Sequence, residues 1–290
     1  MYKRQAQIDS VGKVATSDCD GPAGVNNFIT GTYGTPYPTE VLMAQTWNTD
    51  LLYDLGLAMG QEYADVNNYG VYGPAMNTHR SAFAGRNFEY YSEDGVLAGK
   101  LAAAQVNAMA TKGTYNYIKH FALNDQETNR CAFLLTYSNE QAIREIYLKP
   151  FELCIKNFDG TQIAVMSSFN WIGTVPACAN EDTLTTILRN EWGFQGMVIT
   201  DYDGSYGYMI TDHCVRTGND LMLGFSSQAS NQLTNTESAT LNNALRTSCK
   251  NIMYTIANSG YYTNTTDDSG MSNMLSLIHI SEPTRLQLIS

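Results

Sequence analysis

The chain has 290 residues, which is enough for one large domain or two ordinary ones and enough to bury a sizeable core. Its 28 Asp and Glu residues outnumber its 17 Lys and Arg residues, so the formal net charge is -11. This acidic balance argues against phosphate backbones and anionic membrane surfaces, so we expect no nucleic-acid partner and no membrane partner. A neutral or cationic ligand suits the chain better, and its many aromatic residues, among them 19 Tyr, are compatible with a sugar.

The cysteine and apolar patterns bear on the cellular compartment. The six cysteines are scattered and include no Cys-x-x-Cys pair, which gives no sign of a disulfide scaffold. No run of 18 apolar residues is present, and no apolar segment of signal-peptide type follows the first five residues. These features favour a cytoplasmic location and predict no membrane span.

Short apolar runs at six places have the length of buried strands. The first of them leads from Lys13 into two carboxylates, Asp18 and Asp20, and then into a Gly-Pro turn. The six strands are predicted at or within residues 13–17, 69–77, 115–121, 163–170, 197–199 and 218–224.

Amphipathic patterns predict helices between these strands. Residues 39–40 open the first helical pattern, and Asn48 is expected to cap the second. Ser92 is predicted to cap a third helix, with two acidic residues, 93–94, in its first turn. The later helix starts are predicted at a capping box of Ser138 with Gln141, at Asn180, and at Thr236 or Ser238.

The alternation of helices with strands that are apolar on both faces indicates a parallel α/β protein. The chain length, and the lack of a Gly-rich phosphate loop, favour a TIM-type (β/α)8-like barrel over an open sheet. Because six strands are predicted rather than eight, the barrel is expected to be irregular or incomplete. Residues 1–225 are assigned to the barrel catalytic domain.

The remainder of the chain is predicted to differ from the barrel. Residues 226–262 are expected to form a C-terminal helix that packs on the barrel or leaves it. From Gly260 the composition turns polar, and residues 263–290 are predicted to be a loose tail. Leu275–Arg285 resembles the in-frame translation of a transposon adapter used in DNA library preparation, so 275–290 are interpreted as a sequencing artefact rather than as an ordinary amphipathic tail.

In a parallel barrel the carboxyl ends of all strands open onto one face, so side chains far apart in the sequence converge there. The residues predicted to meet on that face are Asp20, Arg86, Lys119, His120, Arg130, Met166, Phe169 and Asp201. Such a polar set needs a polar ligand or a dense network of ion pairs. A ligand with many hydroxyl groups fits, since carboxylates accept from hydroxyls and cationic side chains donate to them.

Residues 196–204 contain the candidate nucleophile. Here an apolar strand ends in Asp201, Tyr202 and Asp203, which fits a buried strand that delivers acidic side chains. A strand followed by a structural Asx turn is the alternative. Nearby cations are expected to favour the ionised form of Asp201, as a nucleophilic carboxylate requires.

Several longer motifs resemble the barrel domain of glycoside hydrolase family 3, the β-glucosidase family, over about residues 20–222. These motifs are Arg86–Asp94, Lys119–Phe121 with Asn124, Glu127 and Arg130, Met166–Asn170, Glu191–Phe194 and Thr200–Tyr202. Taken alone, Glu127 and Arg130 are equally compatible with a surface ion pair.

The resemblance implies a retaining hydrolase of terminal β-D-glucosyl residues that forms a covalent glycosyl-enzyme. By position, Asp201 matches the nucleophile and Met166 lines the first sugar subsite. The matches to residues that bind the sugar hydroxyls are Asp20, Arg86, Lys119, His120 and Arg130. No metal and no organic cofactor are implied.

This sequence departs from the family pattern in two positions of the site and in one missing part. Phe169 stands where Tyr is common, so a hydroxyl group near the nucleophile is lost, and Tyr202 stands where Trp is usual. In β-glucosidase-like members the acid/base Glu comes from a separate α/β sandwich domain, which does not fit in this chain. We therefore expect the barrel to work with a missing sandwich domain of the parent chain.

Three alternatives stay open. One is a β-xylosidase of the same family, and a second is a non-catalytic carbohydrate-binding barrel. The third is a metal-dependent hydrolase that uses His79, His120, His213 and Asp201, although no His-x-His or His-Glu-x-x-His spacing supports it.

Overall fold

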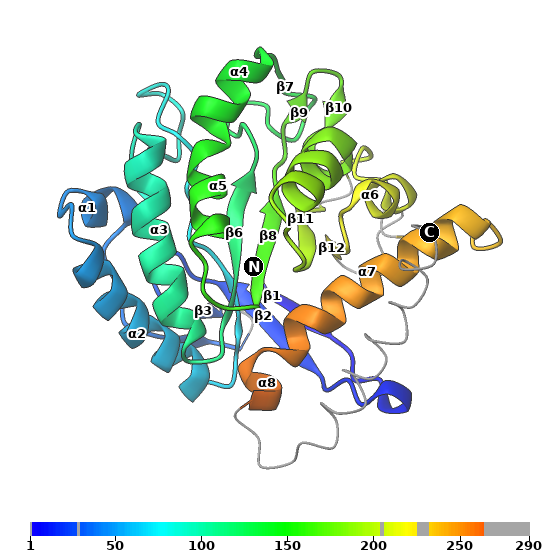
Figure 1. Ribbon diagram of the computed structural model, residues 1–290, viewed down its shortest axis with the longest axis horizontal. Helices are drawn as coiled ribbons and strands as arrows, with labels where there is room; N and C mark the ends of the chain where they lie inside the picture. Colours follow the sequence, from blue (N-terminus) through cyan, green and yellow to red (C-terminus); the bar gives the residue numbers. More distant parts are fainter. Residues whose placement is uncertain (1, 28–29, 204–205, 225–231, 264–290) are drawn as a thin grey trace, which may run out of the picture.

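The computed structural model describes residues 2–27, 30–203, 206–224 and 232–263. Its centre is a curled sheet in which six parallel strands are adjacent in their sequence order (Figure 1). They are β2 (Thr16–Asp20), β5 (Gly70–Tyr72), β6 (Tyr115–Phe121), β8 (Ile163–Ser167), β11 (Val198–Tyr202) and β12 (Leu221–Leu223). The prediction of an irregular or incomplete TIM-type barrel is confirmed.

Short antiparallel strands extend this sheet at its β2 edge. β1 (Tyr2–Gln5) and β3 (Asn26–Asn27) both pair with β2, and β4 (Thr32–Tyr33) pairs with β3. A separate small sheet is formed by β7 (Leu135–Thr136), β9 (Trp171–Ile172) and β10 (Val175–Pro176).

Helices lie on both sides of the curled sheet (Figure 1). The α-helices are α1 (Glu40–Ala44), α2 (Thr49–Asp65), α3 (Gly95–Ala110), α4 (Glu140–Ala142), α5 (Lys149–Lys156), α6 (Thr211–Thr217), α7 (Ala239–Ala257) and α8 (Gly260–Thr263). The π-helical segments are η3 (Ile143–Tyr147) and η5 (Asp182–Glu191), and the 3-10 turns are η1 (Asp9–Val11), η2 (Asn87–Glu89) and η4 (Ala177–Ala179).

Two of the predicted helix caps are wrong by one or two residues. Asp94, not Ser92, caps α3, because its carboxylate accepts from the amides of residues 96 and 97 at 2.7 and 3.2 Å. The Ser92 hydroxyl instead accepts from the Asp94 amide at 3.0 Å. Asn139 caps α4 in place of Ser138, through the amide of residue 142 at 2.8 Å.

The predicted caps of α2 and α7 are confirmed, and Asn180 caps the helical turn at Glu181 that leads into η5. The Asn48 side chain accepts from the amides of residues 50 and 51 at 3.0 and 3.1 Å. Asn180 accepts from the amide of residue 183 at 3.0 Å, and Ser238 accepts from that of residue 241 at 3.4 Å. Each side chain satisfies an amide that has no partner inside its own helix.

The strands alternate between two apolar layers, as the period of two along a strand requires. On one face, Ile118 and Val165 pack against α2, α3, α5 and η5. On the other face, Tyr117 and Met166 pack against a cluster that includes Ile256 of α7. This second layer fills the inside of the curled sheet below the carboxyl ends of its strands.

The first predicted strand corresponds to β2, and its bounds differ from the prediction. β2 begins only at Thr16 and contains Asp18, which the sequence placed beyond the strand. The Asp18 carboxylate is fully buried and accepts from the hydroxyls of Tyr115 and Tyr117, the latter at 3.2 Å. Because these neighbours satisfy the charge, Asp18 belongs to the interior and only Asp20 reaches the open edge.

The polar stretch that begins at Gly260 starts with a short helix, which includes the first residue of the predicted loose tail, Thr263. Residues 260–263 form α8, in which Tyr261 and Tyr262 are buried. The hydroxyl of Tyr262 donates to the carbonyl of Gly12 at 2.8 Å, and that of Tyr261 accepts from the amide of Ser17 at 2.8 Å. These hydrogen bonds connect α8, which follows α7, to β2 and to the segment before it. The adapter-like segment 275–290 lies outside the described residues.

Among the described residues, none of the helices is both long and apolar enough to cross a bilayer.

Candidate active site

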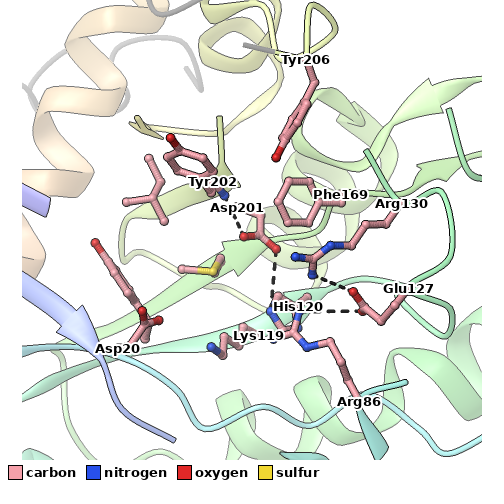
Figure 2. A pocket seen from close by; sticks show the side chains of 13 residues that line it. Asp20, Arg86, Lys119, His120, Glu127, Arg130, Phe169, Asp201, Tyr202 and Tyr206 are labelled. Carbon is pink, nitrogen blue, oxygen red and sulfur yellow. Dashed lines mark hydrogen bonds and ion pairs between the residues drawn. The ribbon is translucent and has the colours of Figure 1, made fainter. Parts of the chain in front are cut away.

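A cavity of about 390 Å³ opens at the carboxyl ends of the parallel strands (Figure 2). All nine residues predicted to form the site line it: Asp20, Arg86, Lys119, His120, Arg130, Met166, Phe169, Asp201 and Tyr202. Four further residues line it as well: Tyr72, Glu127, Tyr206 and Leu223. The structure thus brings the predicted set together, while the roles of its members stay predictions.

Asp201 lies near the end of β11 with 5% of its surface exposed. Its Oδ1 accepts from the Tyr202 amide at 2.7 Å, so the backbone fixes the orientation of the carboxyl group. Its Oδ2 lies 3.7 Å from Nε2 of His120 and has no hydrogen-bond partner in the described part of the chain. One oxygen is therefore held and the other is available to a ligand.

The charge of Asp201 reflects two opposing effects. Burial raises the pKa of its carboxyl group, because the ionised form loses contact with water. The cations of Arg86, Arg130 and Lys119 and the amide of Tyr202 oppose this rise. The cations lower the pKa of Asp201, as predicted from the sequence, but burial has the larger effect and the pKa is raised overall.

The adjacent residues Lys119 and His120 are held rigidly at the end of β6. The His120 amide donates to Oδ1 of Asn77 at 2.7 Å, and Nδ2 of Asn77 donates to the His120 carbonyl at 2.8 Å. The Tyr90 hydroxyl lies 3.1 Å from Nδ1 of the His120 ring. Both side chains lie in the wall of the pocket with at most 5% of their surface exposed.

Burial lowers the pKa of both groups. For His120 the nearby cations of Arg86, Lys119 and Arg130 add to this effect, so its imidazole is neutral at pH 7. Its contact with Asp201 is consequently not an ion pair. For Lys119 the carboxylate of Glu89 opposes the effect of burial most strongly.

A network of ion pairs forms one wall of the cavity. Glu127 Oε2 lies 2.7 Å from Nη1 of Arg130, and its Oε1 lies 3.8 Å from Nη1 of Arg86. Arg86 also donates through Nε to Glu89. Glu127 thus bridges two guanidinium groups that face Asp201, and its pairing with Arg130 is part of the pocket rather than an isolated surface contact (Figure 2).

Aromatic rings continue the cavity lining next to Arg130. The Arg130 guanidinium lies 4.4 Å from the centre of the Phe169 ring, which is a cation–π contact. The ring of Tyr206 lies 5.8 Å from that of Phe169. The Tyr208 hydroxyl donates to the Phe169 carbonyl at 2.9 Å and fixes this segment of backbone.

The sequence contained a signal for some of the additional residues. Tyr72 and Leu223 lie within predicted strands, and in the structure they are the last residues of β5 and β12. Glu127 lies within a motif of the family resemblance. Tyr206 follows β11 in a loop and carries no distinguishing pattern.

The described residues contain no group of three His, Cys, Asp or Glu side chains arranged to hold a metal ion. Of the histidines considered for such a site, His79 is 2.8 Å from the Tyr90 carbonyl through Nε2. His213 belongs to α6 and does not line the cavity.

A curled parallel sheet with a polar cavity at the carboxyl ends of its strands defines a barrel-type α/β domain. The model of the glycosyl hydrolase family 3 N terminal domain matches residues 4–235. This is well over half of the chain, which therefore belongs to glycoside hydrolase family 3.

Named relatives agree with this assignment. Beta-glucosidase A of Butyrivibrio fibrisolvens is 42% identical over 218 residues, which cover 75% of this chain and 26% of that protein. Beta-glucosidase 3B of Thermotoga neapolitana, solved in complex with glycerol, matches with a TM-score of 0.78 and 32% identity over 94% of this chain and 41% of that one. A beta-glucosidase from Paenibacillus barengoltzii matches with a TM-score of 0.78 and 33% identity, covering 89% and 29% of the two chains.

The chain thus spans about a quarter of the length of the curated relatives and 29 to 41% of these two solved chains.

Proposed function

We propose that this chain is the nucleophile-bearing part of a retaining glycoside hydrolase that acts on terminal β-D-glucosyl residues. The observation that carries the proposal is the carboxyl group of Asp201. Its Oδ1 is fixed by a backbone amide, and its Oδ2 faces a cavity of donors without a partner among the described residues. A carboxylate held this way is suited to attack the anomeric carbon of a sugar.

The other polar groups of the cavity are assigned to the hydroxyl groups of that sugar. Asp20 accepts hydroxyl protons, whereas Lys119, Arg86 and Arg130 donate hydrogen bonds. Phe169 and Tyr202 cover apolar faces of the ring, and Met166 lines the same subsite. His120 in its neutral form can donate a ring N–H to a sugar hydroxyl group or to the Asp201 carboxylate.

The acid/base group is assigned to a sandwich domain of the parent protein. Among the described residues of the cavity, the carboxyl groups besides Asp201 are those of Asp20 and Glu127. Burial raises the pKa of Glu127, although Arg86 and Arg130 oppose the rise. Its two oxygens are already engaged, Oε2 with Arg130 at 2.7 Å and Oε1 with the Asn124 amide group at 3.1 Å, so we assign it to holding the guanidinium groups rather than to protonating a leaving group. The chain by itself is therefore expected to form a glycosyl-enzyme only from a donor whose leaving group needs no protonation.

The test uses a dinitrophenyl fluoroglucoside, whose leaving group departs without acid assistance. The chain is incubated with this donor, and the labelled peptide is located by mass spectrometry. One label is expected, on Asp201, and Asp201→Asn is expected to remove it, whereas Asp50→Asn in the exposed first turn of α2 serves as the matched control. A label on another residue in a folded sample contradicts the assignment of the nucleophile.

Two other functions are distinguished by the same experiment. Faster labelling by the corresponding fluoroxyloside indicates a β-xylosidase. Binding of glucose without any label indicates a non-catalytic carbohydrate-binding barrel, which the loss of a hydroxyl group at Phe169 makes reasonable.

A further inference from the structure

The ring of His120 has a polar neighbour at each of its two nitrogens. Nδ1 lies 3.1 Å from the hydroxyl oxygen of Tyr90, and Nε2 lies 3.7 Å from Oδ2 of Asp201. Tyr90 and His120 are each 1% exposed, so bulk water does not replace the contact between them. A neutral imidazole donates through one nitrogen and accepts through the other, so these neighbours decide which nitrogen bears the proton.

A chain of hydrogen bonds fixes the role of the Tyr90 hydroxyl group. Nδ2 of Asn124 donates to Oε1 of Glu127 at 3.1 Å and to the Tyr90 hydroxyl oxygen at 3.2 Å. The other oxygen of Glu127 is paired with Arg130 at 2.7 Å, so the carboxylate is an acceptor. If the Asn124 amide were turned over, its carbonyl oxygen would face this carboxylate and be repelled by it. The Tyr90 hydroxyl therefore accepts from Asn124.

The proton of the Tyr90 hydroxyl is consequently directed at His120. Among the described residues, the side chains in hydrogen-bonding contact with this hydroxyl are those of Asn124 and His120. Because Asn124 is a donor, Nδ1 of His120 is the acceptor. A proton on Nδ1 would place two donors against the Tyr90 oxygen and leave the hydroxyl proton without a partner, which costs about 1–3 kcal/mol for a buried group.

The Nε2 side of the ring leads to the same placement of the proton. With Nδ1 as the acceptor, the proton of the neutral ring lies on Nε2, the nitrogen that faces Asp201 (Figure 2). Oδ2 of Asp201 has no hydrogen-bond partner in the described part of the chain, and a carboxylate oxygen attracts an N–H but repels a lone pair. At 3.7 Å the two atoms are too far apart for a good hydrogen bond, so the N–H is also available to a ligand.

We propose that Tyr90 is a positioning residue for the nucleophile, because its hydroxyl group holds the imidazole of His120 with the proton on Nε2, as a donor directed at Asp201. This inference rests on the proposed function of the cavity. An N–H in this place favours the ionised, nucleophilic form of Asp201 against the effect of burial. It can also donate to a hydroxyl group of the bound sugar. A lone pair in the same place would do neither.

Nitrogen-15 NMR of the histidine rings shows where the proton lies without any substrate. A protonated ring nitrogen and one that accepts a hydrogen bond resonate in well-separated ranges. The chain has four histidines, so the signals of His120 are assigned by their loss in His120→Gln or by their persistence when the other three are replaced. At pH 7 the parent chain is expected to show a protonated Nε2 and an unprotonated Nδ1. A proton on Nδ1, alone or together with one on Nε2, would refute the proposal.

Tyr90→Phe removes the hydroxyl group and keeps the aromatic ring. In this variant the Nδ1 signal of His120 is expected to move to lower field, as that of a ring nitrogen does when it loses its donor. The rate of Asp201 labelling by a saturating concentration of the dinitrophenyl fluoroglucoside is expected to fall about tenfold, which corresponds to about 1.4 kcal/mol for one hydrogen bond.

Tyr91→Phe is the matched control, because it removes a neighbouring buried hydroxyl group that does not contact His120. The Tyr91 hydroxyl donates to Oε1 of Gln105 at 2.6 Å, and Tyr91 packs in the apolar layer around α3 rather than in the lining of the cavity. This variant is expected to keep the His120 signals and the labelling rate of the parent chain. Circular dichroism verifies that both variants are folded.

The remaining outcomes separate this inference from the proposed function. If Tyr90→Phe leaves the Nδ1 signal unchanged, the hydroxyl group is not its donor and the proposal is wrong. If the signal moves while the labelling rate stays the same, or if Tyr91→Phe slows labelling equally, Tyr90 does not position a group of the reaction. A parent chain that no donor labels refutes the proposed function and the role of Tyr90 with it, even where the NMR signals confirm the hydrogen bond.

Discussion

Replacing Glu40 by Gln is expected to make the protein more stable at neutral and alkaline pH. The carboxyl group of Glu40 has a pKa of about 8 in the folded chain, against an ordinary value of 4.5. Because the folded value is raised, the ionised form is destabilising in the folded state. Gln keeps the size of the side chain and cannot ionise, so it removes this pH-dependent cost.

The size of the effect follows from the two pKa values. Stability from Glu40 is fully present below pH 4.5, decreases as the pH rises, and is lost above about pH 8. A difference of one in pKa corresponds to about 1.4 kcal/mol, so the cost of the ionised form at pH 9 is on the order of 5 kcal/mol. At pH 7 the same reasoning gives about 3 kcal/mol.

Urea unfolding followed by tryptophan fluorescence measures this difference at several pH values. The curves of the parent chain and of Glu40→Gln should coincide near pH 4.5 and separate as the pH rises. Glu140→Gln is the matched control, because the Glu140 side chain is 78% exposed and its substitution should change stability by less than about 0.5 kcal/mol. A constant difference between the parent chain and Glu40→Gln from pH 5 to 9 would refute the reasoning.

Glu127→Gln is expected to weaken glucose binding about tenfold, because it leaves Arg86 and Arg130 without the carboxylate that bridges them, and isothermal titration measures this loss. Unchanged affinity would mean that the two guanidinium groups keep their positions without Glu127. Phe121→Ala is expected to lower the free energy of unfolding by about 3–5 kcal/mol, because the fully buried ring packs 5.3 Å from that of Phe151. Urea unfolding checks this loss, and a value under 1 kcal/mol would show that the core refills the space.

The arrangement of the sheet was predictable because parallel strands and their polar ends have a strong local signal. Strands are predicted at residues 115–121, which end in two basic side chains, and within 163–170, and the structure has β6 and β8 in those places. From a parallel barrel, the convergence of Asp20 with Asp201 follows by topology alone, although 181 positions separate them. No side-chain detail is required for that step.

The unpredicted features depend on contacts between distant segments. The interior position of Asp18 needs the hydroxyl groups of Tyr115 and Tyr117, which reach it from another strand. The burial of Tyr261 and Tyr262 depends on the amino-terminal segment that accepts them. A polar composition predicts a loose tail when such tertiary partners are left out of consideration.

Oδ2 of Asp201 and both carboxyl oxygens of Glu40 are buried and have no hydrogen-bond partner within the described part of the chain. An unpaired buried polar group costs about 1–3 kcal/mol, so neither residue is explained by stability. At Asp201, which lines the cavity, a ligand would supply the missing partner. Asp201→Asn, like Glu40→Gln, is therefore expected to raise stability at neutral pH while it abolishes covalent labelling, since burial outweighs the cations in setting the Asp201 pKa. If Asp201→Asn instead lowers stability, the attraction of the nearby cations to the Asp201 carboxylate exceeds the cost of burying its charge, and the reasoning is wrong.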